Sequence, residues 1–259
     1  MNTAQNLTPS HVLQAAPLYP IVNVADDSDT AVARATALAI ALARAGLALV
    51  QLRAKTLGAG DYARLARRLI EQLDPLGCRL IVNDRADVAR AAGAWGLHVG
   101  DEDLPVASAR ELLGPKCLIG YSTHAIAEVA AACDVPAYEV PACEVPDGCE
   151  PRRAADSRLS DNASRGADYL GFGPVFDSPT KAGVRQARGL ELLRLACNRS
   201  TLPVVAIGGM TVERAAACWQ AGATSVAVIS ELERAFESGR LEELLEQYRN
   251  AAAARVPVS

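Results

Sequence analysis

Short apolar runs rich in β-branched residues alternate along the chain with stretches in which apolar residues recur at helical spacing. The runs lie at residues 18–24, 47–53, 79–84, 96–100, 117–122, 168–173, 203–209 and 225–230. The intervening pattern predicts helices at 30–45, 60–73, 86–92, 105–113, 125–132, 189–198 and 211–221, and a last helix near 240–254. Runs that are apolar on both faces are typical of parallel strands covered by helices. Eight such units favour an α/β fold of the (β/α)8 TIM-barrel type over an open sheet.

One segment interrupts this alternation. Residues 134–166 carry four prolines, many polar residues and no clear period. They lie between the fifth predicted helix of the repeat and the sixth strand, where an irregular surface insertion is expected. We therefore predict an N-terminal tail at 1–17 and a single barrel domain over 18–255, with 134–166 as its insertion.

The composition limits the classes of binding partner that are expected. The formal net charge is −4, from 26 basic and 30 acidic residues, so no overall positive field attracts nucleic acid or an anionic membrane. No apolar run is long enough to span a bilayer, and the N-terminus lacks the basic and apolar regions of a signal peptide. The seven cysteines lie mostly in apolar segments, which is typical of free thiols in a reducing compartment. We expect a cytoplasmic protein, and the sequence leaves a homo-oligomer open.

Polar residues gather where the second predicted strand ends, in the sequence QLRAK. Gln51, Arg53 and Lys55 are spaced two apart and so project to one face. Catalytic residues of such barrels lie at the carboxyl ends of the strands. Two cations and an amide there suit a phosphate or pyrophosphate, and the alternative is a solvated strand end.

Carboxylates follow the next two strands. The third run ends in Asn83-Asp84 and the fourth is followed by Asp101-Glu102-Asp103. Beside two cations and an anionic ligand, such acids suit Mg²⁺ held by one or two carboxylates and phosphate oxygens. The alternative is that Asp84 and Asp103 cap the helices that follow them.

The histidines do not indicate covalent catalysis. His98 lies inside an apolar strand, a position more typical of a hydrogen-bonded core histidine than of a base. His124 follows Ser122 and Thr123 at the end of the fifth strand, where both hydroxyls can bond a ligand. The spacing supports no Ser/His/Asp or Cys/His set.

A second anion site is predicted on the other side of the barrel. The loop 171–183 brings two hydroxyls and a lysine, the seventh strand ends in Gly208-Gly209, and the eighth is followed by Ser230. Backbone amides after strands 7 and 8 form a frequent phosphate pocket in these barrels.

As an ordered set, the segments QLRAK, VND, HVGDED, GYSTH, GPVFDSPTK, AIGG and VIS resemble the thiamine phosphate synthase family, over about 18–235 apart from the insertion. The resemblance implies a (β/α)8 barrel and a Mg²⁺-dependent transferase of thiamine biosynthesis. Such an enzyme joins 4-amino-5-hydroxymethyl-2-methylpyrimidine diphosphate (HMP-PP) to 4-methyl-5-(2-hydroxyethyl)thiazole phosphate or its carboxylated form. The products are thiamine phosphate and pyrophosphate, and the implied mechanism is dissociative.

The resemblance also implies roles for individual residues. Those implied to bind HMP-PP are Gln51, Arg53, Lys55, Asn83, Ser122 and Lys181. Of these, the implied catalytic residues are Arg53, Lys55, Ser122 and Lys181. Those implied to hold the thiazole phosphate are Ser178, Thr180, Gly209, Ile229 and Ser230. Asp84 and Asp103 are the implied Mg²⁺ ligands.

Three features depart from the family pattern. Asp101 stands where Gln is usual, and Ser178 stands where Thr is usual. The insertion is the third, and it carries Cys143 and Cys149 without a Cys-x-x-Cys pair or a nearby His, so it does not predict a zinc site.

Three other hypotheses for the function stay open. A thiazole tautomerase-like paralogue would share the barrel and the thiazole phosphate pocket, but would not need the basic end of strand 2 or the metal acids. A non-catalytic protein that binds thiamine precursors would use the insertion as a docking segment. Another phosphate-binding barrel enzyme would leave the polar cluster of strands 2 to 4 unexplained.

Overall fold

The computed structural model describes residues 9–133, 164–177 and 186–254, and side chains from residue 12 onward. Most of the predicted insertion lies outside the described residues, and so do Cys143 and Cys149. The other five cysteines are free thiols. In the described part of the chain, no helix has both the length and the apolar character needed to cross a membrane.

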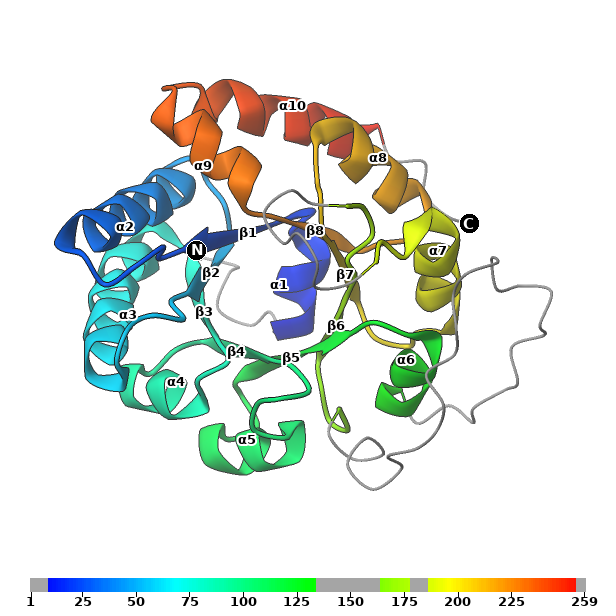
Figure 1. Ribbon diagram of the computed structural model, residues 1–259, viewed down its shortest axis with the longest axis horizontal. Coiled ribbons are helices and arrows are strands. Elements are labelled where there is room, and N and C mark those ends of the chain that lie inside the picture. The colour runs from blue at the N-terminus through cyan, green and yellow to red at the C-terminus, as the bar shows by residue number, and fades with distance from the viewer. Residues whose placement is uncertain (1–8, 134–163, 178–185, 255–259) are drawn as a thin grey trace, which may run out of the picture.

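Eight parallel strands pair in sequence order and close into a barrel (Figure 1). The strands are β1 (Leu18–Asn23), β2 (Leu49–Arg53), β3 (Arg79–Asn83), β4 (Gly96–Val99), β5 (Leu118–Thr123), β6 (Tyr169–Phe172), β7 (Val204–Ile207) and β8 (Ser225–Val228). The closing pair is β1 with β8, whose register aligns Leu18 with Val226. The predicted (β/α)8 barrel is therefore confirmed, with each strand within two residues of its predicted start.

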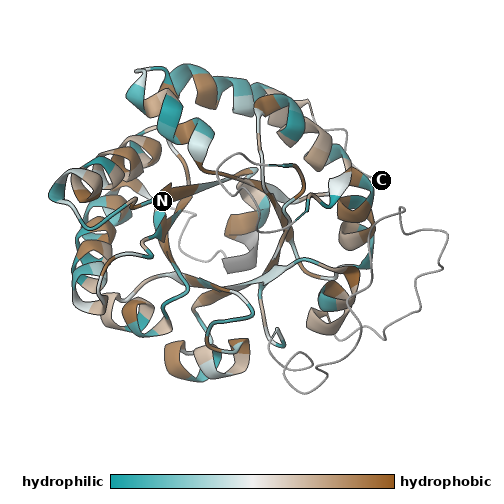
Figure 2. Cartoon of the chain, viewed as in Figure 1, coloured by the Kyte–Doolittle hydropathy of each residue, from teal (hydrophilic) through white to brown (hydrophobic). Residues whose placement is uncertain are grey.

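Helices form the outer ring. They are α2 (Asp29–Arg44), α3 (Ala59–Leu73), α4 (Ala86–Ala92), α5 (Val106–Leu113), α6 (Ile126–Ala132), α7 (Gly189–Arg199), α8 (Val212–Gln220), α9 (Ser230–Glu237) and α10 (Leu241–Ala253). Their apolar faces turn toward the strands and their polar faces outward (Figure 2). The helix α9 was not predicted, because the sequence pattern indicated one helix after the eighth strand rather than two.

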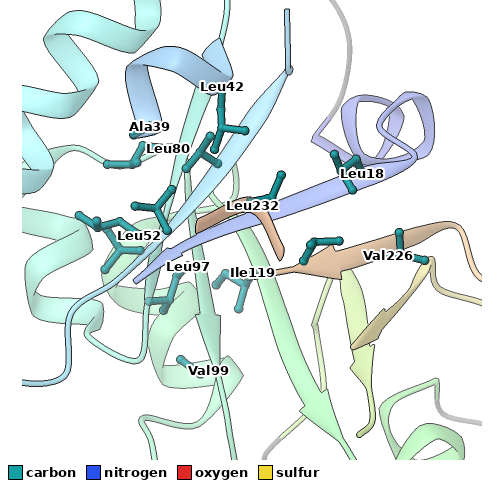
Figure 3. Packing of buried hydrophobic residues seen from close by; sticks show 14 of the residues in the cluster. Leu18, Ala39, Leu42, Leu52, Leu80, Leu97, Val99, Ile119, Val226 and Leu232 are labelled. Atoms are coloured by element: carbon teal, nitrogen blue, oxygen red, sulfur yellow. The ribbon is translucent and has the colours of Figure 1, made fainter. Parts of the chain in front are cut away.

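The main apolar core fills the space between strands and helices. On β2, Val50 and Leu52 face this layer and are fully buried. Leu42 of α2 and Leu80 of β3 pack there as well (Figure 3). The intervening residue Leu49 belongs instead to a second cluster inside the barrel. Period-two alternation thus places positions 49, 51 and 53 on the inner face, and the sequence predicted that the last two share a face.

A further helix, α1 (Pro9–Ala15), lies within the predicted N-terminal tail. Figure 1 shows it across the centre of the barrel. Leu13 is fully buried and joins the inner cluster with Leu49, Ile81 and Leu118. Leu49 and Leu118 are the first residues of their strands, and α1 lies directly before β1, so the helix closes the amino-terminal end of the barrel with apolar contacts. The carboxyl ends of the strands remain as the mouth.

Candidate functional site

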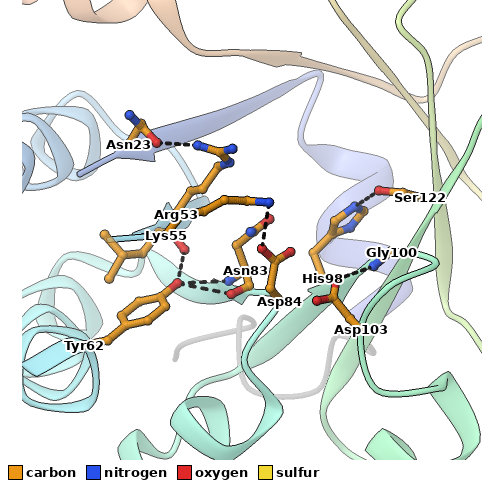
Figure 4. Close-up of polar contacts among 11 residues, drawn as sticks. Asn23, Arg53, Lys55, Tyr62, Asn83, Asp84, His98, Gly100, Asp103 and Ser122 are labelled. Atoms are coloured by element: carbon orange, nitrogen blue, oxygen red, sulfur yellow. Dashed lines mark hydrogen bonds and ion pairs between the residues drawn. The ribbon is translucent and has the colours of Figure 1, made fainter. Parts of the chain in front are cut away.

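The three polar residues at the end of β2 reach different depths. Gln51 is 2% exposed, and its Nε2 donates to the Tyr19 hydroxyl inside the barrel at 3.0 Å. Arg53 Nη1 donates to Asn23 Oδ1 at the end of β1, at 2.7 Å. Lys55 lies beyond the strand, and its Nζ is 3.5 Å from Asp84 Oδ2 (Figure 4). The predicted cluster therefore spans from the interior to the rim, with two cations at the mouth.

Asp84 has a backbone conformation that few non-glycine residues adopt, with φ at 66°. The amide of Arg85 donates to the carbonyl of Asn83 at 2.8 Å, which makes a tight turn centred on Asp84. The Asp84 amide itself donates to the carbonyl of His98 on β4 at 2.7 Å. Such strained residues cluster at functional sites, and here the turn holds the carboxylate beside Lys55.

Tyr62 of α3 fixes the ends of two strands, and the sequence did not predict this role. Its hydroxyl donates to the carbonyl of Leu52 at 2.6 Å and accepts the amide proton of Asn83 at 3.2 Å (Figure 4). The side chain is 1% exposed. The sequence predicts a helix over 60–73, but a helical pattern carries no signal for the partners of a hydroxyl.

Asp103 is held beside β4 and faces Asp84. Its Oδ2 accepts the Gly100 amide proton at 2.8 Å. The pKa of the Asp103 carboxyl is raised to about 6, chiefly by burial and also by the neighbouring Asp84, while the Gly100 amide and Lys55 oppose the change. Two nearby carboxylates disfavour double ionisation unless a cation lies between them.

The capping alternative for these acids is wrong. Helix α4 follows Arg85 and helix α5 follows Pro105, and neither has a side-chain cap hydrogen bond. Asp84 and Asp103 are therefore not used to begin helices.

The two carboxylates suit a hard divalent cation. Within residues 9–133, 164–177 and 186–254, no group of three or more His, Cys, Asp or Glu side chains is placed to hold a metal. Mg²⁺ commonly takes one or two protein carboxylates and completes its shell with phosphate oxygens and water. The raised pKa of Asp103 fits such an ion, which would relieve the repulsion from Asp84.

His98 and Ser122 are joined at the mouth end of the interior. His98 Nε2 lies 2.9 Å from Ser122 Oγ, and Nδ1 lies 3.0 Å from the Tyr169 hydroxyl. Burial lowers the pKa of His98 to about 4, with His124 acting in the same direction and Asp84 opposing it. The ring is thus neutral at pH 7 and has partners on both nitrogens, as expected of a core histidine.

The second predicted anion site lies where β7 and β8 end. Gly208 and Gly209 have φ values of 106° and 61°, a region that favours glycine. Ser230 is the first residue of α9, and Ile229 precedes it. A short helix that begins after β8 presents its free amide groups at this point, which suits an anion. The helix α9, which the sequence did not predict, therefore supplies free amide groups of the kind that the predicted phosphate pocket needs.

The glycine pair also serves packing. A Cβ at Gly208 would lie 2.6 Å from Pro174 Cβ, and one at Gly209 would lie 2.5 Å from the carbonyl oxygen of Asp177. The amide of Phe176 donates to the Gly208 carbonyl at 3.3 Å. The loop after β6 therefore rests directly on the loop after β7. Ser178, Thr180 and Lys181, which continue that loop, lie outside the described residues.

Comparisons with known proteins find similarity to one family over most of the chain. A family model described as thiamine monophosphate synthase matches residues 18–138 and 154–232. A thiamine-phosphate synthase of Albidiferax ferrireducens is 37% identical over 187 residues, 72% of each chain. Another, of Chlorobium luteolum, is 36% identical over 224 residues, 85% of this chain and 88% of that protein.

A solved structure has the same architecture. Thiamine phosphate pyrophosphorylase from Pyrococcus furiosus aligns with a TM-score of 0.68 and covers 94% of this chain and 99% of that chain. Its sequence identity of 23% is low, so this match supports the fold alone.

Proposed function

The chain belongs to the thiamine monophosphate synthase family, and from this premise we propose that it condenses HMP-PP with thiazole phosphate to give thiamine phosphate and pyrophosphate. It is an enzyme, a transferase of thiamine biosynthesis. The observation that supports this specific reaction is that two different candidate anion sites lie at one barrel mouth. One is built from side-chain charges on β2 to β4, and the other from backbone amides after β7 and β8.

The charged site is suited to the diphosphate. Arg53 and Lys55 supply positive charge at the end of β2, and Ser122 supplies a hydroxyl from β5. Arg53 is pre-oriented by Asn23, so less conformational entropy is lost when it binds an anion. Gln51 and Asn83 lie beneath these groups and are buried. We assign this end to HMP-PP, with Lys181 as a further proposed contact.

Asp84 and Asp103 are the proposed ligands of Mg²⁺. The bound ion would neutralise charge that develops on the departing pyrophosphate. Lys55 stands beside Asp84, so it can bind the diphosphate at the edge of the same group. The strained turn at Asp84 keeps the carboxylate in place before the substrate arrives.

The proposed chemistry needs no protein nucleophile. The bond between the pyrimidine methylene carbon and the diphosphate oxygen breaks, and pyrophosphate leaves with the electron pair. The electron-rich aminopyrimidine stabilises the resulting cation, and the thiazole nitrogen then forms the new C–N bond. Arg53, Lys55 and Ser122 stabilise the leaving group where its charge grows.

The amide-built site orients the second substrate. Gly209, Ile229 and Ser230 are proposed to hold the thiazole phosphate, together with Ser178 and Thr180. Fixing this phosphate places the thiazole nitrogen toward the pyrimidine, which lowers the entropic cost of bringing two substrates together. The amides at the start of α9 favour an anion whatever group is attached to it.

The test is an omission experiment. Pyrophosphate and thiamine phosphate are measured with HMP-PP, thiazole phosphate and Mg²⁺ present, and then with each left out in turn. We expect both products in equal amounts and only when all three are present. Thiazole turnover without HMP-PP would favour the tautomerase-like reading, and binding without turnover would favour the non-catalytic one. Either result would overturn the proposal.

A further inference from the structure

Five side chains from five strands form one hydrogen-bonded series across the barrel interior. Gln51 Nε2 bonds the Tyr19 hydroxyl at 3.0 Å, and that hydroxyl lies 2.6 Å from the hydroxyl of Tyr169. Tyr169 is 3.0 Å from His98 Nδ1, and His98 Nε2 is 2.9 Å from Ser122 Oγ. We call this series the relay. It links the residue at the foot of the predicted diphosphate site to a hydroxyl at its edge.

Glycines give the relay its space. The register places Gly120 of β5 between His98 on β4 and Tyr169 on β6. A Cβ at Gly120 would lie 2.0 Å from Tyr169 Cζ, so only glycine lets that ring cross over β5 to reach His98. At Gly171 of β6, a Cβ would lie 3.1 Å from His98 Cε1. Two inward positions are thus left empty so that the aromatic rings can meet.

The hydrogen bonds of the relay are all donated in the same direction, from Gln51 toward Ser122. Gln51 donates an amide proton to Tyr19, and Tyr169 and Gln51 are the hydrogen-bond partners of the Tyr19 hydroxyl among the described residues. Tyr19 therefore donates its own proton to Tyr169. Otherwise a hydroxyl proton would be buried without an acceptor, which is costly. Tyr169 must then donate to His98 Nδ1.

The protonation states agree with this direction. Burial raises the pKa of the Tyr19 and Tyr169 hydroxyls, so both keep their protons at neutral pH. The donor role of Tyr169 also excludes an imidazolium, in which both ring nitrogens donate, so the His98 ring carries a single proton. Because Nδ1 accepts from Tyr169, that single proton is on Nε2, and Nε2 donates to Ser122 Oγ.

We propose that the relay is a positioning device, in which Tyr19 and Tyr169 fix His98 as the Nε2–H tautomer and so direct the hydroxyl proton of Ser122 toward the diphosphate. With its oxygen already accepting from His98, Ser122 has its own proton left to donate. In the opposite tautomer Ser122 would donate inward and present only lone pairs to an anion. The role of Ser122 toward the diphosphate rests on the proposed function, whereas the tautomer does not.

The tautomer can be measured directly in the free protein. The chain has three histidines, so ¹⁵N-labelled histidine gives three sets of ring signals. The His98 set is identified by comparison with His11→Gln and His124→Gln. At pH 7 we expect the two-bond ¹H–¹⁵N pattern of a neutral ring protonated on Nε2. A ring protonated on Nδ1 would overturn the proposal, even if the enzyme makes thiamine phosphate as proposed.

Two tyrosine variants separate positioning from packing. Tyr169→Phe removes the donor to Nδ1, so we expect the Nε2–H preference to fall and the KM for HMP-PP to rise about tenfold, with kcat changing less. Tyr19→Phe removes the proton that keeps Tyr169 a donor but leaves Tyr169 able to donate, so the Nε2–H preference should fall less than in Tyr169→Phe, and KM should change by about threefold or less. Tyr248→Phe removes a buried hydroxyl outside the relay and controls for packing. An unchanged tautomer and KM in folded Tyr169→Phe would overturn the proposal. Failure of the proposed function would instead appear as absent wild-type turnover with the tautomer intact.

Discussion

The mouth of the barrel and its interior use polar side chains in opposite ways. At the mouth, the Lys55 side chain is 60% exposed and faces a carboxylate of Asp84 that is 24% exposed. In the interior, Tyr19 and Tyr169 are almost completely buried and uncharged. Along β2, Gln51 lies in the uncharged interior, and Arg53, two residues later on the same face, lies at the charged mouth.

This difference follows from solvation. A charged group is costly to bury without a partner, so cations and carboxylates stay where water or an anionic ligand can reach them. Neutral hydroxyls and an imidazole can be buried when each is hydrogen-bonded. The apolar helix α1 closes the other end of the barrel through Leu13. Ligands therefore have to enter from the charged end, and the interior is left to hold side chains in place.

The largest effect is expected from a substitution that disrupts the charged mouth. Replacing Asp84 with Ala removes one of two carboxylates, so Mg²⁺-dependent turnover should fall about 10³-fold, the scale of metal stabilisation of a leaving group. Circular dichroism should show an intact fold, since the side chain contributes nothing to the apolar core. Glu102→Gln removes an exposed charge nearby and should be close to wild type. Near-normal turnover of Asp84→Ala would contradict the assignment of Asp84 as a Mg²⁺ ligand.

The next largest effect is expected from a substitution that disrupts the barrel interior. In Gly120→Ala the new Cβ would meet the Tyr169 ring at 2.0 Å, and the surrounding β-strands leave little room for relief. We expect a loss of about 3 kcal/mol in the free energy of unfolding, measured by urea denaturation. Gly58→Ala is the control, because a Cβ there meets nothing within 4 Å. Equal stability of the two variants would show that Tyr169 does not cross β5 as described.

A smaller effect separates binding from chemistry at the mouth. Arg53→Ala removes a cation that Asn23 holds in place, so the KM for HMP-PP should rise by about 10- to 50-fold, as for a lost charged hydrogen bond. Arg64→Ala removes an exposed arginine of α3, whose partner Asp61 is on the same helix, and should leave KM unchanged. A normal KM in Arg53→Ala would place the diphosphate elsewhere.

The smallest effect concerns pH. The folded-state pKa of Asp103 is raised to about 6, so without Mg²⁺ the folded protein holds this proton more tightly than the unfolded chain does. Its contribution to stability is present at low pH and is lost as pH rises through about 6. Asp103→Asn should therefore be more stable than wild type at pH 7.5 by about 1 kcal/mol, a value reduced for solvent screening. The difference should vanish below about pH 4, the region of an ordinary Asp pKa. A constant difference from pH 4 to 8 would contradict the assigned pKa.

The strands and most helices could be predicted because burial imposes a period on the sequence. Leu49 and Val50 lie in different clusters, as alternation requires. The short helix α1 has too few apolar positions to show a period, and α9 is separated from α10 only by residues 238–240.

The position of polar residues at the barrel mouth could be predicted where these residues stand at the ends of strands, as with Arg53 and Asp84. The relay was not, because it depends on which side chains meet across strands distant in sequence. Gly120 lies within an apolar run and resembles any strand glycine until the register places it between His98 and Tyr169. Likewise, nothing local distinguishes the hydroxyl of Tyr62 from that of a tyrosine whose role is packing.

The most direct test of the charged mouth is the binding of Mn²⁺, as a substitute for Mg²⁺, measured by electron paramagnetic resonance with and without pyrophosphate. The account predicts that pyrophosphate strengthens Mn²⁺ binding in the wild-type protein, and that the double variant Asp84→Ala/Asp103→Ala loses this tight binding while it remains folded. Tight, pyrophosphate-dependent Mn²⁺ binding by the double variant would contradict the account.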